Sequence, residues 1–347
     1  MPNGQTYLKT RVSILSSRLL NCAESTELLE MPLDELQAQY FPSAAIEDGM
    51  PANEQNLILE RSLINTLMFE LSVLTRPLTG SARNLLVYWS RKFELFNLKT
   101  LIRGKFSGLD MQEINSNLHD LPASIALPHD ELLQAENVLE MLRLLEHGPY
   151  AYIARQARKV YETKNEAFSL DAAIDRSYFS GLIRAAEITD SADKKALRPL
   201  IGDLIDRQNI LWLYRYRFRY QLSPSETYYL LIPAGRLIDR DKLMHLANLN
   251  SFNEIAENLP TSLAESIGDC TNVMEIRQHL DQQTGDECRR LIAHSPSSVT
   301  RALAYMVARQ TDLANIRAIL QGRTLGLDNE LIREASGVAV CNERMAS

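Results

Sequence analysis

FELFNLKTLIRGK, residues 93–105, has two relatives further along the chain, IDRQNILWLYRYR at 205–217 and TDLANIRAILQGR at 311–323. In each stretch an asparagine is followed directly by Leu or Ile. Another apolar residue stands four positions after the asparagine, and Lys or Arg stands eight positions after it. These asparagine and basic residues are Asn97 and Lys105, Asn209 and Arg217, and Asn315 and Arg323. The asparagines are 112 and 106 residues apart. Three matches at nearly equal spacing predict an internal repeat.

Flanking sequence lengthens this repeat. LERSLINTLMFEL and IDRSYFSGLIRAA share an acid–Arg–Ser triplet, and VMEIRQHLDQQ is a looser third copy. Each repeat is longer than the roughly 20 to 50 residues of a solenoid repeat. We therefore expect a few globular helical domains around a pseudo-threefold axis rather than a superhelix. The predicted repeat units are 1–108, 109–222 and 223–347.

Hydrophobic periodicity predicts helices along most of the chain. Apolar residues recur at three- and four-residue intervals in four long segments, residues 57–74, 132–150, 171–188 and 298–323. Gly148 and Pro149 are expected to end the helix of the second segment. YYLLIP (228–233) is a strand candidate that Pro233 ends. These patterns predict an all-α protein.

NILWLYRYRFRY, residues 209–220, permits two interpretations because aromatic and arginine residues alternate strictly in its second half. Alternation favours a strand with a basic face. The two sister stretches instead place apolar residues at i, i+1 and i+4, which is typical of a helix. We predict a helix over 205–220 in which Arg215 and Arg219 share one face. These arginines are expected to pack along the helix or to contact an acidic partner surface, whereas stacking on single-stranded nucleic acid is the alternative.

The three repeated asparagines also permit two interpretations. A polar residue flanked by apolar ones is usually a satisfied buried group, so their repetition predicts a structural role, in which each side chain bonds a neighbouring helix end. The alternative is direct contact with a partner protein. We expect the structural role.

Composition limits the class of protein. The chain has 347 residues, 45% of them hydrophobic, and a formal net charge of -7, which argues against a general nucleic-acid binder. The four cysteines have no metal-binding spacing and suggest free thiols in a reducing compartment; they are Cys22, Cys270, Cys288 and Cys341. No signal peptide or membrane span is evident, so a soluble protein is expected, with any membrane role through a partner.

With these motifs in view, the sequence resembles the C subunit of V-type/A-type rotary ATPases, whose counterpart in the eukaryotic vacuolar enzyme is the d subunit. FELFNLKTLIRGK, DRQNI and LANIRAILQGR carry the resemblance, with YYLLIPAGRL and IDRSYF as further blocks. The likeness extends from about residue 55 to about 335.

The resemblance implies three similar all-helical domains that form a funnel. It implies a peripheral protein on the cytoplasmic face of the membrane, seated on the proteolipid ring and holding the central stalk. Such a rotor part is not an enzyme; it couples the ring, which moves protons or sodium ions, to the shaft. No small-molecule substrate, nucleic acid or cofactor is implied.

Other functions find little support in the motifs. GxxxxGK[ST], GxGxxG, GxSxG and HExxH are absent, and RGKFSG (103–108) lacks the spacing of a phosphate loop. Cys270, His279, Cys288 and His294 are too irregularly spaced for a zinc site. The alternative to a rotor protein is a helical-repeat protein-binding adaptor unrelated to ion transport. An enzyme with a site assembled from distant residues is a third possibility.

Overall fold

The computed structural model describes residues 2–42, 49–164, 166–268, 270 and 272–338. Within these ranges the chain is helical and contains no β-strand, which confirms the predicted all-α class. The chain divides into two compact units. The larger unit comprises residues 1–78, 191–228 and 233–347, and the smaller unit comprises residues 79–190 and 229–232. The repeat boundaries, the pseudo-threefold axis and the funnel stay predictions.

The larger unit contains most of the helices. Their bounds are α1 Pro2–Ser16, α2 Cys22–Glu30, α3 Leu33–Tyr40, α4 Ala52–Thr75, α11 Ser191–Tyr214, the π-helix η1 Arg215–Arg219, α12 Pro224–Leu230, α13 Arg240–Ala247, α14 Phe252–Glu257, α15 Thr261–Ile267, α16 Val273–His294, α17 Ser298–Thr324 and α18 Asn329–Ala335. Helix α12 begins in this unit, and its last residues belong to the smaller one.

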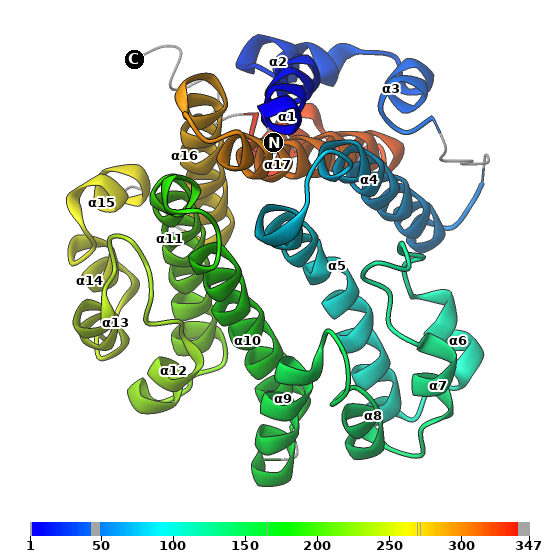
Figure 1. Ribbon diagram of the computed structural model, residues 1–347, viewed down its shortest axis with the longest axis vertical. Helices are drawn as coiled ribbons and strands as arrows, with labels where there is room; N and C mark the ends of the chain where they lie inside the picture. Colours follow the sequence, from blue (N-terminus) through cyan, green and yellow to red (C-terminus); the bar gives the residue numbers. More distant parts are fainter. Residues whose placement is uncertain (1, 43–48, 165, 269, 271, 339–347) are drawn as a thin grey trace. The chain divides into compact units, whose positions relative to one another are not determined.

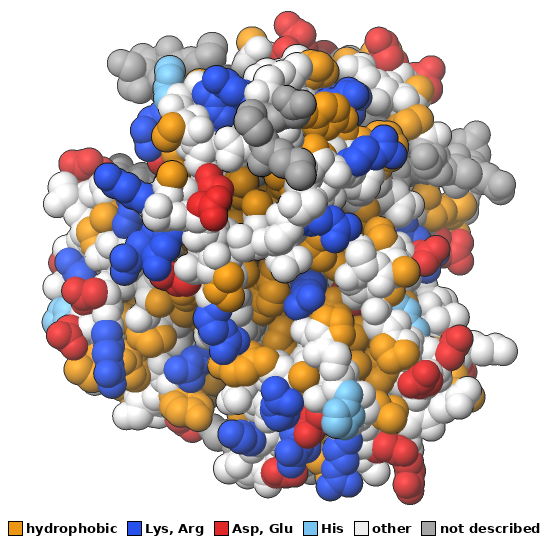
Figure 2. All heavy atoms as spheres, in the orientation of Figure 1, with side chains coloured by type: hydrophobic (Ala, Val, Ile, Leu, Met, Phe, Trp, Pro, Cys, Tyr) orange, Lys and Arg blue, Asp and Glu red, His pale blue; other side chains and the backbone are white. Residues whose placement is uncertain are grey.

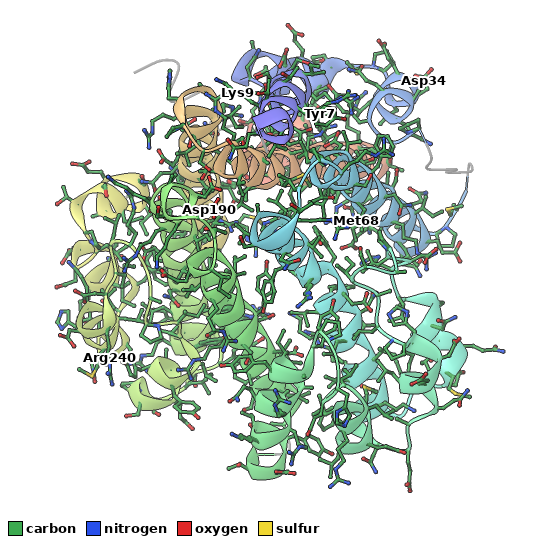
Figure 3. The ribbon with its side chains drawn as sticks, in the orientation of Figure 1. Tyr7, Lys9, Asp34, Met68, Asp190 and Arg240 are labelled. Carbon is green, nitrogen blue, oxygen red and sulfur yellow. The ribbon has the colours of Figure 1, made fainter. Side chains whose placement is uncertain are left out.

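Helix α17 forms the core of the larger unit. It packs against α1, α4 and α16, and α1 lies across it in Figures 1 and 3, where Tyr7 and Lys9 mark α1 and Met68 marks α4. Every residue from Ala302 to Arg309 is buried. A helix enclosed on all sides in this way belongs to the interior of a domain.

The smaller unit is built around α5 and α10. Its helices are α5 Gly80–Ser107, α6 Met111–Ser116, α7 His129–Gln134, α8 Val138–Leu144, α9 Ala151–Lys164 and α10 Ala167–Glu187. The Tyr178 hydroxyl on α10 donates a hydrogen bond of 2.8 Å to the Trp89 carbonyl on α5. Gly181 allows this close approach, because a Cβ there would stand 1.8 Å from the Tyr88 hydroxyl oxygen.

The three repeated asparagines lie on the long helices α5, α11 and α17. Each of these helices packs against a long helix that carries an upstream part of the repeat: α5 against α10, α11 against α16, and α17 against α4. Three of the four predicted long helices, over 57–74, 171–188 and 298–323, correspond to α4, α10 and α17. Among the described helices, none combines the length and the apolar character of a membrane span.

The strand candidate at 228–233 is wrong, because α12 runs from Pro224 to Leu230. The helix begins with a capping box, in which the Ser223 hydroxyl accepts the Glu226 N–H and the Glu226 carboxylate accepts the Ser223 N–H. Proline suits the first position of a helix because its missing N–H is not needed there. This start signal outweighs the β-propensity of the aromatic residues that follow.

The single helix expected over 132–150 is also wrong. Helix α7 ends at Gln134, and α8 begins only at Val138. The Asn137 side chain accepts the Glu140 N–H at 3.0 Å and starts the second helix. An N-cap asparagine requires an extended backbone conformation, so it separates two helices whose apolar residues read as one pattern.

Candidate functional site

The repeated basic residues bind the backbone at helix ends. Lys105 Nζ donates to the carbonyls of Leu133 and Ala135, at 2.6 and 2.8 Å, where α7 ends. Arg323 Nη1 donates to the carbonyl of Met31, the residue that follows α2. The last carbonyls of a helix lack intrahelical donors and carry its negative dipole end. A positive side chain therefore stabilises each of these ends.

Arg217 has an equivalent position in the second repeat. Its Nη1 donates to the Leu222 carbonyl at 2.7 Å, and its Nη2 donates to the Leu249 carbonyl at 3.1 Å, just beyond the end of α13. All three basic residues thus hold a distant chain segment through its carbonyls. These contacts support a structural role for this part of the repeat.

Asn97 connects α5 to the loop after α6. Its Nδ2 donates to the His119 carbonyl at 2.8 Å, and its Oδ1 accepts the His119 N–H at 2.8 Å. Nδ2 also donates to Glu94 Oε2, while Glu94 Oε1 accepts the Leu127 N–H and lies 2.7 Å from His129 Nε2. Asn97 and Glu94 are 0% exposed. Asn209 is also fully buried, and Asn315 is half-buried.

Buried acids precede the repeated asparagines, a feature absent from our sequence interpretation. Asp206 accepts three successive backbone N–H groups, from Arg236, Leu237 and Ile238, at 2.9, 2.7 and 3.1 Å. Burial raises the pKa of Asp206 from 3.8 to about 6, although these hydrogen bonds act in the opposite direction. The carboxylate fixes the loop beyond α12 against α11.

Asp312 likewise binds the backbone of a distant segment in the third repeat. It accepts the Leu20 N–H at 2.9 Å, where the chain leaves α1 for α2. Burial raises the pKa of Asp312 to about 6, and Arg289, with its Nη2 3.9 Å away, lowers it in part. The signal was visible in the sequence, since an acid stands three residues before each repeated asparagine; the acids are Glu94, Asp206 and Asp312.

The first and third repeats end their long helices alike. Gly108 and Gly326 have φ values of 67° and 66° and each stands 11 residues after the repeated asparagine. Glycine is suited to this left-handed conformation because it lacks a Cβ. In the second repeat the corresponding residue is Gln221, with φ of 53°, and it stands 12 residues after Asn209.

The π-helix η1 accounts for this extra residue. Its hydrogen bonds close one residue later than those of an α-helix, as in the 3.0 Å bond from the Tyr220 N–H to the Arg215 carbonyl. The predicted helix over 205–220 is therefore confirmed to Arg219, but its last part is π-helical rather than α-helical. The segment has one more residue than its sister stretches.

The aromatic residues of this segment form two columns with a spacing of four. Trp212 stacks on Tyr216, which stacks on Tyr220, with ring centroids 6.2 and 6.5 Å apart. Tyr214 lies 5.8 Å from Phe218 in the second column. The alternation in sequence thus reflects side-chain stacking along a helix.

The two arginines expected to contact a partner are both exposed. Arg215 Nε donates to the Tyr220 hydroxyl at 3.2 Å, and its guanidinium lies 5.4 Å from the centre of that ring. Arg219 projects from the last turn of η1. Arg217 differs from its neighbours because it is half-buried and holds two carbonyls.

A charged cluster around the buried Glu70 joins α4 and α17 to the segment that follows α1. Glu70 is 0% exposed and accepts hydrogen bonds from Arg18 Nη1 at 3.0 Å and from the Tyr305 hydroxyl at 2.7 Å. Arg309 Nε lies 3.5 Å from the same carboxylate, and its Nη1 donates to the Arg18 carbonyl at 3.1 Å. Burial raises the pKa of Tyr305, so the phenol stays protonated and donates its hydrogen bond to Glu70.

The described residues do not group into a metal site of three or more His, Cys, Asp or Glu side chains. Cys270 and Cys288 are both buried, and burial raises the pKa of the free Cys288 thiol to about 12. Cys341 and the Cys22 side chain lie outside the described residues. The thiol of Cys288 is therefore held in its protonated, unreactive form.

A cleft of about 300 Å³ lies beside α11 and α16 in the larger unit. Its arginines are paired with carboxylates, as Arg236 is with Asp203 and Arg290 with Glu287 at 2.6 Å. These pairs neutralise two of the three arginines that line the cleft. On the face shown in Figure 2, acidic and basic side chains are likewise interspersed.

Comparisons with a family model and with individual proteins point to the same family. A model of the ATP synthase (C/AC39) subunit family matches residues 8–335. The chain is 24% identical over 341 residues to the C subunit of the A-type ATP synthase of Methanosarcina mazei, covering 96% of this chain and 92% of the relative. It is 26% identical over 347 residues to the protein of the same name from Haloquadratum walsbyi, covering 94% and 96%.

Proposed function

The chain belongs to the ATP synthase (C/AC39) subunit family, and from this membership we propose that it is a non-catalytic rotor subunit of a V-type/A-type ATPase. In this role it couples the proteolipid ring of the membrane sector to the central stalk. The observation that carries the proposal is the family match over nearly the whole chain, residues 8–335. The relatives are similar in length as well as in sequence.

The contacts at helix ends support a mechanical role. A rotor part has to transmit torque without shearing, so the segments between its helices must be held firmly. Lys105, Arg217 and Arg323 each bind carbonyls at a distant helix end or loop. Asp206 and Asp312 bind backbone N–H groups of distant segments. Charge-assisted hydrogen bonds of this kind are about twice as strong as neutral ones.

The proposed location is the cytoplasmic face of the membrane, where the protein is peripheral and reaches the bilayer only through the ring. The chain has a formal net charge of -7. Cytoplasmic loops of membrane proteins carry an excess of Lys and Arg, so an acidic collar suits such a ring. Neutralising exposed acids is expected to weaken ring binding.

The test is a pull-down of the tagged chain from gently solubilised membranes, with the co-purifying proteins identified by mass. Recovery of a small proteolipid together with central-stalk proteins would support the rotor role. Recovery of soluble partners alone, with no rotary ATPase subunit, would refute it and favour a protein-binding adaptor. A tagged Glu70→Ala variant, in which the buried cluster loses its carboxylate, controls for capture by unfolded protein.

A further inference from the structure

The segment Arg215–Tyr220 is where the second repeat departs from the other two. It contains one extra residue, taken up by η1, and it is followed by Gln221, the one non-glycine residue with a positive φ among those the structure describes. A left-handed conformation costs a non-glycine residue about 1 kcal/mol. The departure therefore has a stability cost that the first and third repeats avoid with Gly108 and Gly326.

The positive charge of this segment is not neutralised within the described chain. Arg215, Arg217 and Arg219 make no ion pair with any described carboxylate, and residues 207–225 contain no Asp or Glu. Elsewhere in the larger unit, Arg207 pairs with Asp281 and Arg317 with Glu60. Three closely spaced arginines thus have no acidic partner among the described residues of a chain with 44 acidic residues.

Two of the exposed side chains of the segment, Arg215 and Tyr220, are held in place. Tyr220 is 39% exposed and rests on the stacked column of Trp212 and Tyr216. Arg215 is fixed against Tyr220 by a hydrogen bond of 3.2 Å and by its position over the ring. A surface that is ordered before binding loses less conformational entropy when a partner arrives.

We propose that Arg215, Arg219 and Tyr220 form a docking surface for an acidic protein segment of a subunit outside the proteolipid ring. The inference rests on the proposed function, because it takes the rotary ATPase as the source of the partner. Charge complementarity identifies the partner as acidic. Arginine and tyrosine are the residues that anchor protein interfaces.

Two further observations select a protein outside the ring. Two exposed arginines give only about 1 kcal/mol each at an anionic membrane, where lipid recognition uses clusters of roughly four to eight basic residues. The surface also occurs in the second repeat alone. A ring of identical subunits presents the same contact many times, whereas a feature found once suits a partner present once.

Photo-crosslinking in the assembled complex tests the proposal. Tyr220 is replaced by p-benzoylphenylalanine, and the adduct is mapped by mass spectrometry. The matched control carries the same replacement at Tyr152, which is 37% exposed in the smaller unit. We expect Tyr220 to crosslink to an Asp- and Glu-rich peptide of a subunit other than the proteolipid. Adducts confined to the proteolipid, or no adduct above the control, would overturn the proposal.

Charge reversal supplies a second measurement. Arg215→Glu with Arg219→Glu is expected to reduce retention of the crosslinked partner about tenfold at moderate salt. The control is Arg143→Glu with Arg155→Glu, two exposed arginines of α8 and α9. Equal retention by both variants would refute the docking surface.

The remaining outcomes separate this inference from the proposed function. Loss of binding to phosphatidylserine vesicles, without loss of the crosslinked partner, would assign the arginines to a lipid surface and overturn the proposal. If the wild-type chain recovers ring and stalk and the double variant behaves identically, the docking surface alone is refuted. Wild-type chain that recovers no ATPase subunit refutes the proposed function.

Discussion

Asp206→Asn is expected to remove a pH dependence that this buried carboxyl imposes on folding. Burial raises the pKa of Asp206 from 3.8 to about 6 in the native protein. The native state therefore keeps a proton that the unfolded chain releases between these two pH values. The contribution to stability is fully present below pH 3.8 and is lost as the pH rises through about 6.

The magnitude follows from the difference in pKa. Each pKa unit corresponds to about 1.4 kcal/mol, so a difference of about two units corresponds to about 3 kcal/mol. Asparagine does not titrate, and its amide cannot accept all three N–H groups of residues 236–238. The substitution therefore changes the free energy of unfolding by a constant amount and removes the part of it that depends on the pH. Relative to wild type, the variant's free energy of unfolding should rise by about 2.5 kcal/mol between pH 4 and pH 7.

Urea titrations of both proteins at unit pH intervals from 4 to 8 measure this difference. Asp203 is close by and remains in both proteins, so its own titration largely cancels in the comparison. Asp110→Asn serves as the control, because it removes an exposed carboxylate that caps α6. A difference between Asp206→Asn and wild type that stays constant across this range would refute the reasoning.

Three further changes test other contacts, each by chemical unfolding. Lys105→Met should lower the free energy of unfolding by about 2 kcal/mol, because two carbonyls lose a charged donor; an unchanged value contradicts the capping role. Gln221→Gly should raise it by roughly 1 kcal/mol by relieving a positive φ, and Gly108→Gln should do the opposite. Glu70→Ala should lower it by about 3 to 5 kcal/mol, since buried Arg309 is left unpaired; a loss below 1 kcal/mol would show that water replaces the carboxylate.

The long helices were predictable because their signal is repeated many times. In 57–74 and 298–323 the apolar residues recur over several turns, and the matching helices α4 and α17 are found. The short elements were less predictable, since one capping residue decides them. Ser223 and Glu226 start α12 inside a segment that resembles a strand, and Asn137 divides a pattern that resembles one helix.

The repeat correctly predicted a helix at 205–220, although the local alternation favoured a strand. An ungapped comparison of the three stretches could not reveal that this helix ends as a π-helix. The three stretches align without insertion from the asparagine to the basic residue, and the extra residue follows Arg217. Its presence becomes visible only where Gln221 takes the left-handed position that Gly108 and Gly326 occupy one residue earlier.

Whether an arginine of this segment has an acidic partner could not be predicted from the neighbouring sequence, because the partner can lie far along the chain. Arg207 lies on the same chain segment and finds Asp281, which is 74 residues away. Arg215 and Arg219 find no described carboxylate, although composition alone favours pairing in a chain with 44 acids and 37 bases. The fold neutralises Arg207 and Arg317 but leaves Arg215 and Arg219 exposed, and Arg215 is held in place by its hydrogen bond to Tyr220. An acid supplied by another protein of the complex would complete a pairing that the described residues do not provide.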